Sequence, residues 1–294
     1  MERKRIKRLT GLKHDIGFPV VRLLPAAGQR FVGPFVFLDH MGPARFGNGD
    51  TQGDVRPHPH IGLATLTYLF DGAMMHRDSL GSVQRIEPGE LNWMSAGTGI
   101  VHSERIPEDI RSNGKTVEGL QLWMALPLEE EHSAPHFRHV KADAMPVIAT
   151  DGMELKLVAG RGFGCAAAIP QHGNMLLADL RLCMDQTFEW NAELPERAVY
   201  CVEGSLRIGD ERLEAGEMVV LPDDGSITLT AALTSRAILL GGEPLDGPRH
   251  LWWNFVASDP AALPRAREAW QKGEFVAIPG ESERIDAPVF VHRD

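Results

Sequence analysis

This chain of 294 residues lacks the long apolar stretches that membrane insertion requires. No uninterrupted apolar run reaches about 18 residues, which excludes a transmembrane helix. The N-terminal residues also lack the apolar core of a signal peptide, so we expect no secretory leader. These absences predict a cytoplasmic protein with no membrane partner.

Cysteine is scarce as well. The three cysteines, Cys165, Cys183 and Cys201, match no metal-binding spacing, and an odd number cannot pair completely. All three lie in apolar, strand-like surroundings, where we expect buried, reduced thiols. A disulfide framework is therefore excluded.

Positive charge is in deficit, with 30 Lys and Arg against 40 Asp and Glu and a net charge of -10. This balance argues against a general nucleic-acid surface, and we expect no direct nucleic-acid partner. One local exception is a basic cluster near the N-terminus, which we interpret as a solvated terminus. It comprises Arg3, Lys4, Arg5, Lys7 and Arg8.

Strand signals dominate the remainder of the chain. The 30 glycines and 20 prolines favour many short strands joined by turns. The clearest expected strands cover residues 34–39, 63–70, 91–94 and 120–126. One helix is expected near the C-terminus, with Ser258 as its N-cap, Gly273 as its end and Trp270 on its apolar face.

Turn-forming residues and the acidic run 129–131, interpreted as a solvated linker, indicate a domain boundary. We therefore predict domains at residues 1–130 and 131–294. Two patterns repeat across this boundary, at the domain scale. Residues 68–72 are echoed by 200–204, and residues 87–91 by 214–218. Two all-β domains of one architecture follow from this duplication.

Two matched pairs of residues carry the strongest chemical signal. His58 and His60 are separated by one residue, as are His102 and Glu104. On a β-strand this spacing places both side chains on the same face. If the two strands are neighbours, three imidazoles and one carboxylate converge on one metal ion.

The second copy lacks these ligands. Residues 188–192 read Phe-Glu-Trp-Asn-Ala and residues 229–231 read Leu-Thr-Ala where the metal-binding residues would recur. Only the first domain is therefore expected to hold a metal. Since the second copy dispenses with the histidines, the fold does not need them, which favours a functional reading of the first site.

The ligand set suits Fe(II), but also Mn, Co, Ni, Cu or Zn. The other histidines are interpreted as surface or satisfied core residues, and His40 as a turn residue that could also lie near the site. Those others are His14, His76, His132, His136, His139, His172, His250 and His292.

Two segments give the chain a family resemblance. Residues 56–62, Arg-Pro-His-Pro-His-Ile-Gly, resemble the first motif of the pirins, and residues 92–104 resemble their second motif. The resemblance implies two tandem cupin β-barrels of the jelly-roll type with a short C-terminal helix. It further implies one metal, iron, bound by His58, His60, His102 and Glu104. Ala64 is a departure, because pirins usually carry Glu at this position.

The resemblance implies two functions, and the site itself leaves a third open. The first is a quercetin 2,3-dioxygenase-like oxidoreductase, which cleaves quercetin or a related aromatic enol with O2 and uses Glu104 as catalytic base. The second is a regulatory binding protein, sensitive to the redox state of its iron, that acts on a transcription factor or metabolic enzyme. The third is a bicupin whose metal only stabilises the barrel. The substrate-binding residues are not readable from the sequence, although Phe35, Phe37, Trp93 and Met94 are candidates for lining a pocket.

Overall fold

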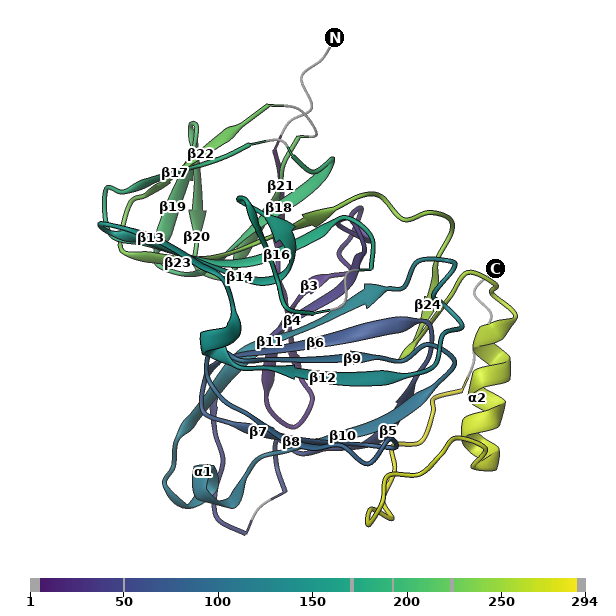
Figure 1. Ribbon diagram of the computed structural model, residues 1–294. Helices are drawn as coiled ribbons and strands as arrows, with labels where there is room; N and C mark the ends of the chain where they lie inside the picture. The colour runs from purple at the N-terminus through teal and green to yellow at the C-terminus, as the bar shows by residue number, and fades with distance from the viewer. Residues whose placement is uncertain (1–5, 50, 170–171, 192, 223–224, 290–294) are drawn as a thin grey trace. The chain divides into compact units, whose positions relative to one another are not determined.

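The computed structural model describes residues 6–49, 51–169, 172–191, 193–222 and 225–289 (Figure 1). Of the residues singled out above, Arg3, Lys4, Arg5, Ala192 and His292 lie outside these ranges. Within them the chain is mainly β-strand, with two α-helices and one short 3₁₀ helix, which confirms the all-β class. None of the helices described is long and apolar enough to cross a membrane.

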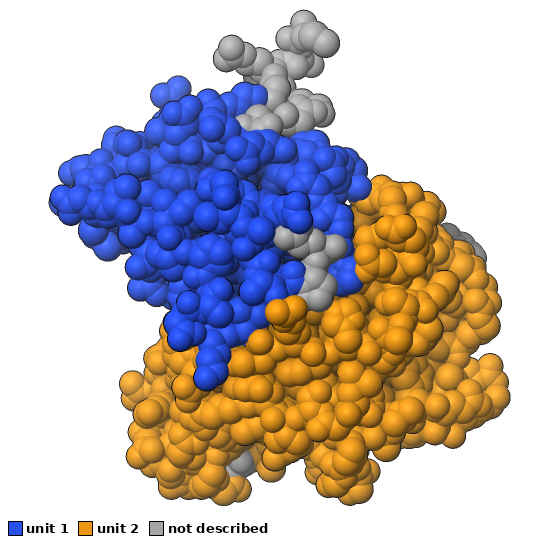
Figure 2. Space-filling view, viewed as in Figure 1, with its two compact units in different colours: residues 1–14, 21–39, 140–244 blue, residues 15–20, 40–139, 245–294 orange. Residues whose placement is uncertain are grey.

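The chain forms two compact units, and neither is one continuous segment (Figure 2). Unit 1 comprises residues 1–14, 21–39 and 140–244, and unit 2 comprises residues 15–20, 40–139 and 245–294. The division at residue 130 stays a prediction of domain boundaries. Part of the acidic run is not solvated linker, because Glu131 is buried and accepts a hydrogen bond from Ser258 N at 2.9 Å.

Unit 2 contains two facing sheets, each built from antiparallel neighbours (Figure 1). The smaller sheet has the order β5-β10-β7-β8, and the larger contains the run β12-β9-β6-β11. The smaller-sheet bounds are β5 Val55–His60, β7 Met74–Asp78, β8 Val83–Ile86 and β10 Ile100–Arg105. Those of the larger are β6 Leu63–Asp71, β9 Leu91–Ser95, β11 Thr116–Ala125 and β12 His136–Val140.

The C-terminal part of unit 2 adds the hairpin β24 (His250–Trp252) and β25 (Phe255–Ala257) and the helix α2 (Ala262–Lys272). The predicted N-cap at Ser258 is wrong, because the helix begins after Ala261, with Asp259 Oδ1 accepting the Ala261 N–H instead. Its end at Gly273 is confirmed, in the left-handed conformation that glycine favours. Its buried face consists of Leu263, Ala266 and Trp270, which confirms the expected position of Trp270.

Unit 1 also contains two antiparallel sheets. One has the order β1-β21-β18-β23-β16-β14-β13, with β15 on β14, and the other β17-β22-β19-β20. The bounds of the first are β1 Lys7–Thr10, β13 Val147–Thr150, β14 Met153–Gly162, β15 Cys165–Ala166, β16 Met175–Leu182, β18 Glu196–Glu203, β21 Glu217–Val220 and β23 Ser235–Gly242. Those of the second are β17 Thr187–Trp190, β19 Ser205–Ile208, β20 Glu211–Glu214 and β22 Ile227–Ala231. The sheets enclose one apolar core, built around residues such as Leu180, Val199 and Leu239.

The remaining elements are β2 (Leu12–Asp15), β3 (Pro19–Leu24), β4 (Phe35–Arg45), α1 (Glu108–Ser112) and the 3₁₀ helix at Ala142–Ala144. β3 and β4 each belong in part to both units. The four predicted strands correspond to β4, β6, β9 and β11 and are confirmed. His40 lies in β4 and is buried, so its interpretation as a turn residue is wrong.

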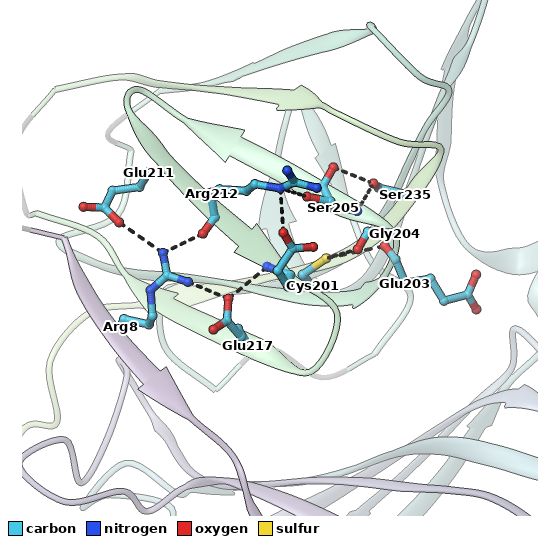
Figure 3. Close-up of polar contacts among 10 residues, drawn as sticks. Arg8, Cys201, Glu203, Gly204, Ser205, Glu211, Arg212, Glu217 and Ser235 are labelled. Carbon is cyan, nitrogen blue, oxygen red and sulfur yellow. Dashed lines mark hydrogen bonds and ion pairs between the residues drawn. The ribbon is translucent and has the colours of Figure 1, made fainter.

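Polar contacts fix β1 against the neighbouring strands of unit 1 (Figure 3). The Arg8 guanidinium donates to Glu217 at 2.5 Å and to Glu211 at 3.0 Å. Nearby Cys201 is buried and free, and burial raises the pKa of its thiol to about 12. The expectation of three buried thiols is wrong for Cys183, which is exposed, and Cys165 is half-buried.

Candidate metal centre

Strands β5 and β10 bring three histidines together. The two strands pair antiparallel, with His58 directly opposite His102, so residues on one face of the pair are cross-strand neighbours. His58, His60 and His102 are 7%, 1% and 1% exposed. One nitrogen from each ring lies within 4.8 Å of the others. The convergence predicted from the spacing is therefore present for the imidazoles.

Backbone carbonyls orient two of these rings. His58 Nδ1 lies 2.9 Å from the carbonyl oxygen of Arg56, and His60 Nδ1 lies 2.9 Å from that of Asn254. Each Nδ1–H can donate only if the proton is on Nδ1, which leaves the Nε2 lone pair free. His60 Nε2 lies 3.0 Å from His102 Nε2. This arrangement resembles the outer contacts that fix metal-binding histidines in other proteins.

Burial keeps the three imidazoles neutral. Desolvation lowers the pKa of His58 to about 4, and it lowers the pKa values of His60 and His102 well below their usual range. Repulsion between the neighbouring rings lowers them further. Neutral imidazole is the form that binds a cation. His102 Nδ1 makes no hydrogen bond, so the site contains a buried polar atom that the protein does not satisfy. These residues fit a divalent transition metal.

Glu104 lies beside the three histidines but does not join their cluster. The pairing of β10 with β5 shifts register between His102 and Glu104, where a bulge interrupts the ladder. Glu104 Oε1 is 3.4 Å from His102 Nδ1, without hydrogen-bond geometry, and the buried Oε2 has no partner. Burial raises the pKa of Glu104 to about 8, and the charge of Glu281 adds to this effect. Its role as a ligand stays a prediction.

A fourth histidine borders the cluster and was missed by sequence reasoning. His76 on β7 is buried, its ring centroid is 5.3 Å from that of His102, and it stacks on Phe137 at 4.4 Å. Its Nε2 lies 3.0 Å from Asp78 Oδ2. His76 was interpreted only as a surface or satisfied core residue, and its carboxylate partner beside the metal site was not expected. Its signal was the same one-residue spacing, in His76-Arg77-Asp78.

The larger sheet presents a polar row to the histidines. Trp123 lies against His60, with ring centroids 5.2 Å apart, so this face of β11 looks toward the site. Alternation places Gln121 on the same face, and its cross-strand neighbour Thr67 donates to it at 2.8 Å. Asn92 pairs with Thr67 in turn and lies 2.9 Å from His139 Nδ1. His139 thus also has a side-chain partner that was not expected from the sequence.

The four residues expected to line a pocket do not lie together: they belong to different units and to opposite faces of one strand. Met94 shares the face of Asn92, whereas Trp93 points to the opposite face of β9. Phe35 and Phe37 belong to unit 1. Ala64 pairs with Ser95 on β9, again on the face turned away from Trp123. Alanine in place of the usual glutamate therefore removes no side chain from the polar row of Thr67, Asn92 and Gln121 that faces the histidines.

Two described cavities lie within unit 2 without being lined by the three histidines. One, of about 480 Å³, lies between α2, β25 and the loop at Gly97–Gly99. The other, of about 500 Å³, is lined by Asp54, Arg77, Arg105 and residues 279–281.

Two all-β units, one of them with three clustered histidines that fit a metal ion, define a two-domain protein of the cupin type. The Pirin family matches residues 17–124 and the Pirin C-terminal cupin domain matches residues 177–276. The chain belongs to the pirin family. A "Pirin-like protein" of Caulobacter vibrioides is 42% identical over 280 residues, covering 91% of this chain and 96% of that protein.

Solved structures agree with this assignment. A crystal structure of quercetin 2,3-dioxygenase from Acinetobacter baumannii superimposes with a TM-score of 0.89 at 36% identity, covering 98% of this chain and 97% of the other. A second structure with that name and source has a TM-score of 0.86 at 26% identity, with coverages of 94% and 99%.

Proposed function

We propose that this chain is a metal-dependent dioxygenase that cleaves quercetin, or a related flavonol or aromatic enol, with O2. The observation that carries the proposal is the buried cluster of three neutral imidazoles on β5 and β10. The similarity to structures named quercetin 2,3-dioxygenase supports the substrate class. His58, His60 and His102, with Glu104 as a fourth ligand, would hold one divalent transition metal, with Fe(II) as the first choice.

When bound, such a metal supplies Lewis acidity toward a substrate hydroxyl and the redox chemistry that O2 requires. Glu104 then serves as the base that takes the proton from the substrate 3-hydroxyl. The carboxylate is well placed for this role because its Oε2 has no partner in the protein. In the overall reaction both atoms of O2 enter the product and carbon monoxide leaves.

The remaining residues position the substrate and exclude water. Trp123 packs against His60 and Phe137 stacks on His76, so both rings place aromatic surface beside the histidines. Gln121, Thr67 and Asn92 supply hydrogen-bonding groups that match the oxygens of a polyphenol. All three histidines are nearly inaccessible, so entry of a flavonol requires the surrounding side chains to move.

An anaerobic loading experiment tests the function. The metal-free protein is loaded separately with Fe(II), Mn(II), Ni(II) and Cu(II), quercetin is added, and air is then admitted. We expect oxygen uptake and loss of the flavonol absorbance with at least one metal. Stoichiometric metal without turnover would reject the dioxygenase for this substrate and favour the regulatory binding protein. Added metal that raises the melting temperature without turnover or any partner would favour a structural ion.

A further inference from the structure

Strand β10 is held from its outer face as well as from the face that carries His102. Because side chains alternate across a strand, Ser103 and Arg105 project away from His102 and Glu104. The Ser103 hydroxyl donates to Glu281 Oε1 at 2.6 Å, and Arg105 Nη2 donates to Glu281 Oε2 at 2.7 Å. One carboxylate therefore binds both residues that flank Glu104.

The hydrogen bonds from Ser103 and Arg105 to Glu281 lie where the pairing of β10 with β5 is irregular. The register between β10 and β5 shifts between His102 and Glu104, so Ser103 has no regular partner on β5. On the other side, β7 pairs regularly with residues 102–105. The shift places two residues of β5, Arg56 and Pro57, opposite Ser103, so the extra residue of the bulge lies on β5, next to His58. Glu281 binds Ser103, the β10 residue opposite this bulge, and so adds a contact outside the ladder.

The same C-terminal segment touches the chain beside the other two histidines. Asn254 O lies 2.9 Å from His60 Nδ1. Ile285 N donates to the carbonyl oxygen of Pro57, next to His58, at 2.9 Å, and the Trp270 indole donates to Ile285 O. Residues 254–285 thus contact β5 and β10 beside every histidine of the site.

Glu281 is suited to this role by its charge and its burial. Its side chain is 11% exposed. Burial by itself would raise its pKa, but the hydrogen bonds from Ser103 and Arg105 outweigh burial and lower it. A charge-assisted hydrogen bond between ionised groups is about twice as strong as a neutral one. Glu283 also reaches Arg105, at 3.0 Å, yet its side chain is 58% exposed. Glu283 provides a matched control.

We propose that Glu281 is a positioning residue for the metal centre: by holding Ser103 and Arg105 it fixes the direction in which His102 and Glu104 project. The proposal rests on the metal site of the proposed function but not on its substrate. Outer contacts of metal ligands contribute about 10- to 100-fold to metal affinity. Glu281 contacts none of the ligands itself and acts on them through Ser103 and Arg105 of β10.

Cobalt binding to the full-length metal-free protein tests the proposal. Co(II) affinity and the visible absorption bands of the bound ion are measured for wild type, Glu281→Ala, Glu281→Gln and Glu283→Ala. We expect Glu281→Ala to weaken binding about 10-fold or more and to shift the bands. Glu281→Gln keeps an acceptor for Ser103 and should recover part of the loss. Glu283→Ala should stay within about twofold of wild type, as expected for an exposed ion pair.

A double-mutant cycle separates positioning from general stability. Ser103→Ala removes one hydroxyl and should weaken Co(II) binding, and adding Glu281→Ala should cost less than the sum of both changes. Wild-type affinity and bands in Glu281→Ala would overturn the proposal, as would an equal loss in Glu283→Ala or strict additivity in the cycle. If Glu281→Ala unfolds, Ser103→Ala and Glu281→Gln carry the test. A failed quercetin assay with normal cobalt binding would reject the substrate alone.

Discussion

Both units contain the same two glycine turns, although only one unit contains the histidines. Gly72 and Gly204 have φ angles of 77° and 78°. A Cβ there would lie 2.4 Å from Thr116 O in unit 2 and 2.3 Å from Thr234 O in unit 1. Only glycine fits such a position without strain, in either unit. The duplicated sequence pattern therefore corresponds to a duplicated backbone.

The second repeated turn agrees in its hydrogen bonds. Gly89 N donates to Leu69 O at 2.8 Å, and Gly216 N donates to Cys201 O at 2.8 Å. In both turns a glutamate carboxylate accepts the backbone N–H three residues before it, at 2.8 Å for Glu90 and 2.9 Å for Glu217. All four hydrogen bonds lie within their own unit and involve none of the three clustered histidines, so each unit forms its turns without the metal site.

The units differ at one pair of strands. In unit 1, β17 and β22 occupy the chain positions that β5 and β10 occupy in unit 2, and they carry Trp190 and Leu229, both buried. Beside them the fully buried Arg197 donates to four backbone carbonyls and lies 5.6 Å from the Trp190 ring. Unit 1 thus places a buried arginine beside this pair of strands, whereas unit 2 places three neutral imidazoles on the corresponding pair. Burying three imidazoles costs desolvation that the fold does not require, which favours a function for them.

Removing one imidazole should produce the largest effect. His60→Ala deletes a ring that Asn254 orients, and we expect Co(II) affinity to fall more than about 100-fold, beyond the loss typical of outer contacts. Turnover should disappear with it. Metal content by mass spectrometry and quercetin loss are the measurements. The control is His172→Ala, a buried histidine of unit 1, which should retain the metal. Equal metal content in the two variants would mean that the site is misassigned.

Removing the buried Arg197 of unit 1 should destabilise that unit without affecting the metal site. Arg197→Met leaves four carbonyl oxygens without their donor, and each unsatisfied buried group costs about 1–3 kcal/mol. We expect the free energy of unfolding to fall by about 3 kcal/mol or more in urea titrations. Cobalt binding by the folded fraction should remain as in wild type. Loss of cobalt binding at full folding would show that the units are energetically coupled.

The pH dependence of metal binding should give the smallest effect. With the pKa of Glu104 near 8 in the metal-free protein, metal that binds the carboxylate must displace its proton below that pH. Cobalt affinity should therefore rise between pH 6 and 8, by at most about tenfold per unit. The histidines add nothing to this slope, because their lowered pKa values keep them neutral.

Glu104→Gln should flatten this dependence, and an unchanged slope would show that Glu104 does not bind the metal. The metal-free protein should respond in the opposite sense. A raised pKa means that the stability contributed by the protonated carboxyl is complete below pH 4.5 and is lost as the pH rises through about 8. Thermal melts of wild type and Glu104→Gln between pH 6 and 9 measure this difference.

Much of the fold and the imidazole cluster could be predicted because the signals are local. Apolar, strand-forming runs over residues 63–70 and 120–126 predicted two strands of the larger sheet, and the one-residue spacings placed the ligands on a common face. The start of α2 was misjudged because Ser258 donates its N–H to Glu131 instead of capping the helix. The place of His76 beside the cluster could not be predicted, because it depends on the pairing of β7 with β10 and not on a local spacing.

The sequence by itself determined the turns, the alternation of the strands and the identity of the three histidines, because each depends on residues a few positions apart. Only the tertiary structure decided what surrounds them. His60 and Asn254 are separated by 194 residues, and Ser103 and Glu281 by 178. Such contacts leave no periodic trace in the chain. They form because residues 245–294 belong to unit 2 although they lie far along the chain from its strands. The apolar face of α2 and the ionised Glu281 contact β10 only after the chain has folded.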